Sequence, residues 1–369
     1  MPQIILVFLL FFLPFVALPF GISPFESPKV ILAEILIEIL LLLHFFKKNF
    51  LSRIKLQKYQ LILSGIIIVL TLLHLILFPS PTSFFGNPFR LQGIFILWYL
   101  LAFSVVAANI KTDKIPNYIY LFSIVLIFIT IIAFGGNENG RAVGTLGEPN
   151  ALAATAIFIF PFLVFRQKNF IKVLGFIFAL IIIFLSGSRS GLVAFLIESV
   201  FILLSQFMKL SIAKSFSLSL ILLILSLLLP VIEGGGWFEN RSVIWQTALI
   251  AGFNSLLIGS GFGNIDKALH QASVTMNNLL QHQFIDSSHN FILDFWIQGG
   301  IVGLTALTAI IFFSIKNLIN QSKTLELTAL LGLLTVMSFN PVSVTTLVAF
   351  WWALGQGFDT NKHQTRLHT

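Results

Sequence analysis

The chain of 369 residues is 57% hydrophobic and only 10% charged, with a formal net charge of +8 and no cysteine. Soluble domains contain about 25% charged residues, so this composition excludes an ordinary soluble domain. The lack of cysteine excludes disulfides, thiolate catalysis and cysteine-based metal sites. The apolar runs are continuous rather than alternating, which excludes a transmembrane β-barrel and predicts an all-α, polytopic membrane protein.

Twelve apolar runs predict membrane spans, each of which needs about 20 mostly apolar residues. The first run has no basic residue before it, so we expect a spanning helix there instead of a cleaved signal peptide. The predicted spans are residues 3–22, 29–46, 60–78, 93–110, 115–134, 149–165, 171–186, 190–207, 215–232, 291–315, 324–339 and 342–358.

The spans divide the chain into four regions. Residues 1–232 hold the first nine transmembrane helices, and residues 233–290 form the one long polar loop, in which we expect interfacial helices. Residues 291–358 hold the last three spans, and residues 359–369 form a tail.

Basic residues orient these spans. With the N-terminus in the cytoplasm, 16 Lys and Arg residues fall in inside segments and six in outside segments, as the positive-inside rule requires. Both termini are then cytoplasmic, and the loop 233–290 lies on the external, periplasmic face of the inner membrane. Of the inside residues 13 of 16 are Lys, whereas four of the six outside residues are Arg. Arginine grips phosphate with a planar fork, so the outer face is predicted to bind an anion, with small-number chance as the alternative.

The segment Ser186-Gly-Ser-Arg189-Ser-Gly191 separates two spans with small residues. An arginine between two spans is costly unless it faces a polar cavity or an anion. We therefore expect Arg189 to bind a phosphate group, and the alternative is a surface arginine in a tight turn.

A helix is predicted to start at Arg241, with Asn240 as its N-cap. The helix dipole disfavours a cation in the first turn, so a bound anion would satisfy both Arg241 and the free helix N–H groups. A solvated Arg241 is the alternative. One face is less polar and is expected to lie on the membrane surface; its residues are Val243, Ile244, Thr247 and Ala248.

His289 stands at the mouth of the tenth span, and its pKa range suits a general base near neutral pH. Asp286 is a possible orienting partner, whereas Asp294 lies roughly 140° around the predicted helix and is not expected to be one. The alternative is an interfacial histidine that caps the helix. The spacings of the loop histidines match no zinc pattern, so no metal site is predicted.

Two further features have a structural interpretation. Gly259-Ser-Gly-Phe-Gly-Asn264 lacks the full dinucleotide-binding pattern and predicts a tight turn. Glu198 lies within the eighth span and is expected to face the bundle interior.

In their order and spacing, the motifs resemble the O-antigen ligase and O-antigen polymerase family of bacterial surface-glycan enzymes. The segments that carry the resemblance are Phe89-Arg90-Leu-Gln-Gly93, Arg141-Ala-Val-Gly144-Thr-Leu-Gly-Glu-Pro-Asn150, Ser186-Gly-Ser-Arg189-Ser-Gly191, and the loop with Arg241-x-x-x-Trp245, Gly259-x-Gly261 and His289 before Gly299-Gly300.

The resemblance implies a membrane glycosyltransferase whose donor is a glycan on a polyprenyl diphosphate, typically undecaprenyl diphosphate. The acceptor is lipid A-core in ligases and another lipid-linked glycan in polymerases. Arg189 and Arg241 would hold the diphosphate, and His289 would act on the acceptor hydroxyl; the match is looser at Arg90 and Arg141, which would add to substrate binding. Neither a nucleotide sugar nor a metal or other cofactor is implied, nor a nucleic-acid partner.

Three alternatives stay open beside a ligase. They are a surface-polysaccharide polymerase, a protein O-oligosaccharyltransferase, and a flippase for lipid-linked glycans. Transporters often show inverted repeats and helices broken in both halves, whereas this chain shows no internal repeat and one long loop on a single side, which favours an enzyme.

Overall fold

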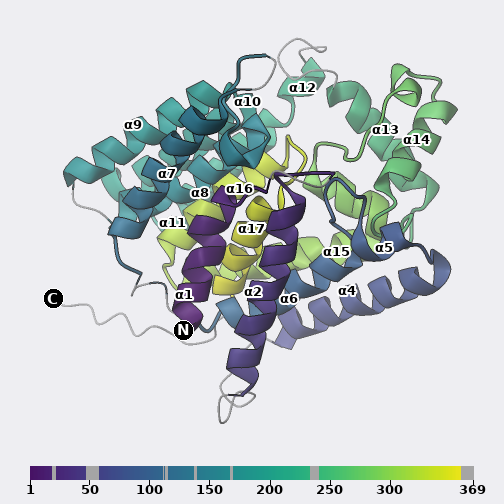
Figure 1. Cartoon of the computed structure of the whole chain (residues 1–369), viewed down its shortest axis with the longest axis horizontal. Coiled ribbons are helices and arrows are strands. Elements are labelled where there is room, and N and C mark those ends of the chain that lie inside the picture. Colours follow the sequence, from purple (N-terminus) through teal and green to yellow (C-terminus); the bar gives the residue numbers. More distant parts are fainter. Residues whose placement is uncertain are drawn as a thin grey trace.

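The computed structural model of the chain describes residues 1–18, 22–46, 58–110, 112, 115–136, 139–166, 169–232 and 241–358. These residues form a bundle of helices joined by loops (Figure 1), which confirms the all-α membrane fold. Six described segments are long and apolar enough to cross a membrane by length and composition, and the total number of crossings stays a prediction. These segments are Lys58–Leu77, Pro149–Arg166, Asn169–Ser186, Arg189–Phe207, Ile212–Ile232 and Phe291–Asn320.

Every span expected from the sequence coincides with a helical segment. In chain order these are α1 with η1 and η2 (Pro2–Phe15), α2 (Ser27–Phe45), α4 (Lys58–Leu77), α6 (Ile94–Ala107), α7 (Tyr118–Phe134), α8 (Pro149–Arg166), α9 (Asn169–Ser186), α10 with η4 (Arg189–Phe207), α11 with α12 (Ile212–Ile232), α15 (Phe291–Asn320), α16 (Thr324–Met337) and α17 (Val344–Gln356). The shorter elements between them are α5 (Pro81–Phe85), η3 (Gly144–Leu146), α13 (Arg241–Asn254), α14 (Ile265–Thr275) and η5 (Leu279–His282).

The helices differ in how much of their surface the protein itself covers. Every residue of α17 is buried, and in α8 72% of the most apolar stretch is buried, against 28% in α9 and 33% in α4. Figure 1 shows α16 and α17 at the centre of the bundle, with α9 and α4 at its edges. Glu198 on α10 is fully buried and faces Gly332 of α16, as expected for an acidic residue within a span. The outer helices keep apolar faces that suit contact with lipid tails.

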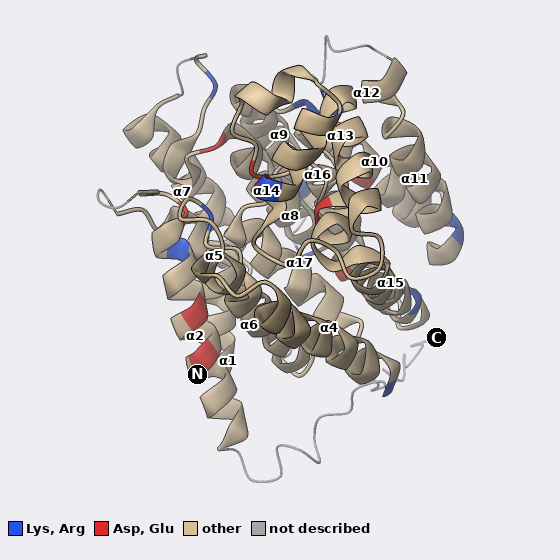
Figure 2. Ribbon diagram, turned by 90° about the vertical axis from the view of Figure 1, so that its right-hand side faces the viewer, with Lys and Arg blue, Asp and Glu red and all other residues tan. Residues whose placement is uncertain are grey.

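The loops that connect successive helical segments lie in turn at one end of the bundle and at the other, and hydrogen bonds join the loops that share an end. Figure 2 shows most charged residues in loops and near helix ends. The bonds at the end that carries the predicted site residues are Glu26–Val344, Arg90–Asp286, Arg90–Glu148, Gln92–Val342 and Ser190–Asn340. The bonds at the opposite end are Ala107–Gln356, Asn317–Gly357 and Lys323–Gln356. This alternation is the arrangement expected if each helical segment crosses the membrane once.

The helix α15 is broken at Gly300, whose backbone has φ 60° and ψ −163°. The segment 256–261, which follows α13, pairs with the backbone groups on both sides of the break. The bonds are Ile301 N–H to Leu256 O, Val302 N–H to Leu257 O, Ser260 N–H to Ile297 O and Gly261 N–H to Gln298 O. Unpaired backbone groups are costly within a membrane, so the two irregular segments stabilise each other. The glycine-rich segment expected to be a tight turn therefore also closes the break in α15.

Replacing Gly300 by alanine is expected to lower stability by about 3 kcal/mol, because both the backbone and the space require glycine. A Cβ at Gly300 would lie 2.4 Å from the backbone of Leu257, and its φ of 60° is strained for other residues. Thermal unfolding in detergent measures the effect as a lower Tm. The matched control is Gly65→Ala in α4, where no atom lies within 4 Å of the added Cβ. Equal Tm values for the two variants would show that the break is not closed in this way.

Candidate active site

His289 lies in the loop directly before α15 and has a left-handed backbone, with φ 60°. The helix begins at Phe291, and the side chain of Asn290 accepts hydrogen bonds from the N–H groups of Ile292 and Leu293. Asn290 therefore caps the helix, and His289 does not. The imidazole of His289 is left for another role.

Asp294 orients the backbone at His289. Its Oδ2 accepts from Ser287 Oγ at 2.6 Å, and its Oδ1 accepts from the N–H of Ser288 at 2.6 Å. Ser287 Oγ in turn accepts from the N–H of His289 at 3.0 Å. As expected from its place on the helix, Asp294 does not bond the His289 ring; its carboxylate reaches back to the loop and holds the backbone there, which the sequence did not predict.

The imidazole of His289 is partly buried between charged groups. Burial, followed by the positive charge of Arg241, lowers the pKa of His289 to about 3, while Asp286 opposes this shift and Arg90 adds to it. The Nδ1 atom is buried and has no hydrogen-bond partner among the described residues. The imidazole is thus neutral near pH 7, with one ring nitrogen able to accept a proton.

Hydrogen bonds connect Arg241 to the start of α10, where Arg189 lies. Arg241 begins α13, as predicted, although its expected cap Asn240 lies outside the described residues. A guanidinium N–H of Arg241 donates to Asn340 Oδ1 at 3.3 Å, and Asn340 Nδ2 donates to Ser190 Oγ. Ser190 directly follows Arg189, the partly buried first residue of α10. Asn340 therefore connects Arg241 to the start of α10, where Arg189 lies.

Arg141 joins the same network from another loop. Its Nε donates to Ser186 O at 2.8 Å, and its Nη2 donates to Asn150 Oδ1 at 3.3 Å. The hydroxyl of Ser188, the N-cap of α10, donates to the same Asn150 oxygen at 2.9 Å. We call Arg141, Arg189 and Arg241, with Asn150 and Asn340, the arginine network. The Ser188 and Ser190 hydroxyls are hydrogen-bonded at 3.1 Å, so Arg141 and Arg241 are joined at the helix start that carries Arg189. Arginines gathered in this way suit a polyanion such as a diphosphate.

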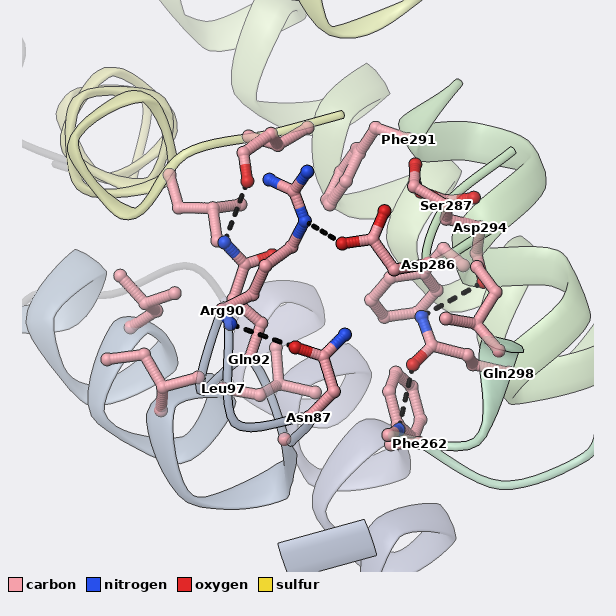
Figure 3. A pocket seen from close by; sticks show the side chains of 18 of the residues that line it. Asn87, Arg90, Gln92, Leu97, Phe262, Asp286, Ser287, Phe291, Asp294 and Gln298 are labelled. Carbon is pink, nitrogen blue, oxygen red and sulfur yellow. Dashed lines mark hydrogen bonds and ion pairs between the residues drawn. The ribbon is translucent and has the colours of Figure 1, made fainter. Parts of the chain in front are cut away.

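Arg90 stands apart from that network because carboxylates hold it. Its Nε donates to Asp286 Oδ2 at 2.5 Å, and its Nη2 pairs with Glu148 Oε1 at 3.3 Å. Figure 3 shows the guanidinium of Arg90 turned toward Asp286. Asp286, a possible orienting partner of His289, instead bonds Arg90. The pair lies close enough for both charges to act on His289.

A pocket opens beside this pair, between α6, α15 and α17, and holds about 820 Å³ of empty space with the open solvent at its mouth included. Its polar end holds Arg90, Asp286 and Gln298, which Figure 3 shows around the opening. Its apolar end is lined by Leu100 and Trp351, among other residues. A cavity that is polar at one end and apolar at the other suits an amphipathic molecule.

The predicted surface face of α13 packs inside the protein. Ile244, Thr247 and Ala248 are buried, and Ala248 belongs to a small core with residues of α14 and with Ile297 of α15. The prediction that these residues face the membrane surface is wrong, because this side of α13 packs against α14 and α15. Among the described residues, no three His, Asp or Glu side chains are placed to hold a metal ion.

The sequence model of the family described as O-antigen ligase matches residues 174–308. No curated protein matches the chain. The matched stretch contains Arg189, Arg241, His289 and the break at Gly300, whereas Arg90 and Arg141 lie before it. The resemblance indicated by the sequence motifs is confirmed for this part of the chain, and the match supports a membrane glycan-transfer function of the ligase or polymerase type.

Proposed function

Since the chain carries an O-antigen ligase domain, we propose that it transfers a glycan from a polyprenyl diphosphate to a hydroxyl group of a lipid-linked acceptor, without a nucleotide sugar. The observation that carries this proposal is the position of His289. It is a neutral histidine that lies near enough to Arg241 of the arginine network and to the Arg90–Asp286 pair for their charges to act on its pKa. The site faces the exterior of the inner membrane, as the charge bias of the loops predicts.

The arginine network binds the diphosphate of the donor. As the bond between the anomeric carbon and the diphosphate oxygen breaks, negative charge grows on that oxygen, and fixed guanidinium groups stabilise it. The leaving group is a stable anion, so no strong general acid is required. The polyprenyl tail extends along the apolar surface of the bundle.

His289 accepts the proton of the acceptor hydroxyl while the acceptor oxygen attacks the anomeric carbon. One carbon–oxygen bond forms and one breaks in a single displacement, polyprenyl diphosphate leaves, and the proton stays on the imidazole. Asp294 and Ser287 hold the backbone of His289 during this step. A single displacement inverts the configuration at the anomeric carbon, which NMR of the product checks; retained configuration would contradict the direct step.

The lowered pKa of His289 predicts an unusual pH dependence. The pKa is about 3 in the free protein, so the base is already deprotonated from pH 5 to 8. The acid limb of kcat/KM, which reports the free enzyme, is therefore expected below about pH 4 and not near 6.5. A bound diphosphate offsets the charge of Arg241 and raises the pKa, so the acid limb of kcat lies at higher pH than that of kcat/KM. Initial rates across pH 4–8 should therefore give a kcat/KM that shows no acid limb near pH 6.5, while the acid limb of kcat moves up toward this range; a limb of kcat/KM near pH 6.5 would contradict the buried environment of His289.

Reconstituted vesicles test the proposed function against a flippase. The purified protein receives a polyprenyl-diphosphate glycan and a lipid-linked acceptor, and glycosylated acceptor is measured by mass spectrometry. We expect transfer, with release of polyprenyl diphosphate. Translocation of the donor between leaflets without transfer would replace this proposal by transport.

A further inference from the structure

A second cavity lies on the other side of the Arg90–Asp286 pair. It lies among the loops that precede α2, α6, α8, α15 and α17, and it holds about 710 Å³ of empty space with the open solvent at its mouth included. Both cavities are lined by Arg90 and Asp286, so this ion pair stands between them. The residues that line only the second cavity include Phe25, Glu26, Phe89, Glu148 and Ser343.

The charge of the second cavity is opposite to that of the arginine network. Three carboxyl groups, from Glu26, Glu148 and Asp286, face a single guanidinium, that of Arg90. Lys29 lies behind the lining, where its ammonium group donates to Phe25 O and Thr145 O, and its charge acts on Glu26. When the positive charge of Lys29 is set against the negative charge of Glu26, the two carboxylates of Glu148 and Asp286 still face the single positive charge of Arg90. A diphosphate is therefore favoured at the arginine network and disfavoured in the second cavity.

The lining has the chemistry that binds an uncharged saccharide. Carboxylates accept hydrogen bonds from sugar hydroxyls, the remaining N–H groups of the Arg90 guanidinium donate to sugar oxygens, and the rings of Phe25 and Phe89 offer apolar faces for sugar C–H groups. Phe89 is 50% exposed and Glu148 is 45% exposed at its side chain, so both are accessible to a ligand.

We propose that the second cavity binds the terminal sugar of the acceptor, and that this sugar is uncharged or carries an amine instead of a phosphate. The inference rests on the proposed function and assigns the acceptor to a separate part of the same site. Asp286 lines the cavity three positions before His289, and Glu148 lies two positions before Asn150 of the arginine network. An acceptor hydroxyl in the cavity would thus approach His289 from Asp286, and the donor diphosphate from Arg241, since both residues lie near enough for their charges to act on His289.

The test measures the KM for the donor and the KM for the acceptor separately in the full-length protein. Initial rates are measured with a neutral oligosaccharide acceptor and with its phosphorylated counterpart, for the wild type, Glu148→Gln and Phe89→Ala. We expect the wild type to have a KM for the neutral acceptor at least about tenfold below that for the phosphorylated one, since one missing pairing of this kind is worth a factor of about ten. Glu148→Gln raises the KM for the neutral acceptor, narrows the difference between the two acceptors and leaves the KM for the donor in place. Phe89→Ala raises the KM for both acceptors.

Asp266→Asn is the matched control, because it removes a carboxylate from the first turn of α14, outside the second cavity. It should change neither KM. An unchanged acceptor KM in both Glu148→Gln and Phe89→Ala would overturn the acceptor site, as would a preference for the phosphorylated acceptor. Slow transfer of the donor glycan to water, followed in the absence of acceptor, tests the proposed function separately. Its absence together with absent transfer would reject the enzyme itself, whereas its presence with unchanged acceptor KM values would reject only the second cavity.

Discussion

Alanine at position 289 is expected to lower kcat for glycan transfer by about 10²- to 10⁴-fold, the usual contribution of a positioned general base. The residue makes this contribution because its imidazole is neutral and lies near Arg241 and the Arg90–Asp286 pair, where it accepts the acceptor proton. Donor binding should persist, since the arginine network stays intact. Single-turnover kinetics with saturating acceptor, together with donor binding measured by tryptophan fluorescence, separates the two effects.

His270→Ala serves as the matched control for this variant. His270 is exposed on α14, a helix that packs against α13 and α15, and no role in the site is assigned to it. It should transfer glycan at the wild-type rate. Full activity of His289→Ala would remove the proposed base from the mechanism.

Lysine in place of Arg241 is expected to raise the KM for the polyprenyl-diphosphate donor about tenfold to a hundredfold, because a charge-assisted hydrogen bond contributes about 1.5–3 kcal/mol. Lysine keeps the charge but loses the planar fork and, with it, the bond to Asn340 that holds the guanidinium near Ser190. The KM for the acceptor should stay within about twofold of the wild-type value, because the acceptor is proposed to bind in the second cavity, away from Arg241. Inorganic pyrophosphate should also inhibit this variant less than the wild type.

Arg166→Lys is the control for this substitution. Arg166 lies in the last turn of α8, at the end of the helix opposite Asn150, and the exchange there should leave the donor KM as it is. A donor KM that is the same in Arg241→Lys and the wild type would show that bidentate diphosphate binding is not the role of Arg241.

The helices were predictable because lipid imposes long apolar runs, and each predicted span coincides with a helical segment. The pairing of the 256–261 segment with the break at Gly300 was not predictable. It depends on backbone conformations that bring two distant glycine-rich segments together, and a glycine in the sequence is equally compatible with a simple turn. The face of α13 was misassigned because the same apolar pattern suits a lipid surface or a protein core.

The candidate site was predictable where chemistry restricts the residue type. Arg189, Arg241 and His289 stood out because charged or titratable groups between spans are costly. Asn150 and Asn340 gave no comparable signal, since an amide in a loop is common, and only the fold shows that they connect arginines from different loops. Asp294 was missed for another reason: its position on the helix points away from the His289 ring, but its carboxylate reaches Ser287 and Ser288 in the preceding loop.

In the proposed reaction, the glycan leaves a polyprenyl diphosphate and joins an acceptor hydroxyl at His289. The most direct measurement mixes the purified protein with a radiolabelled polyprenyl-diphosphate glycan and an acceptor in the presence of EDTA, and quantifies both products. We expect one polyprenyl diphosphate released for each acceptor glycosylated in the wild type, and both products to form at least about a hundredfold more slowly in His289→Ala. Release of a polyprenyl monophosphate, or transfer that continues at the wild-type rate without His289, would contradict it.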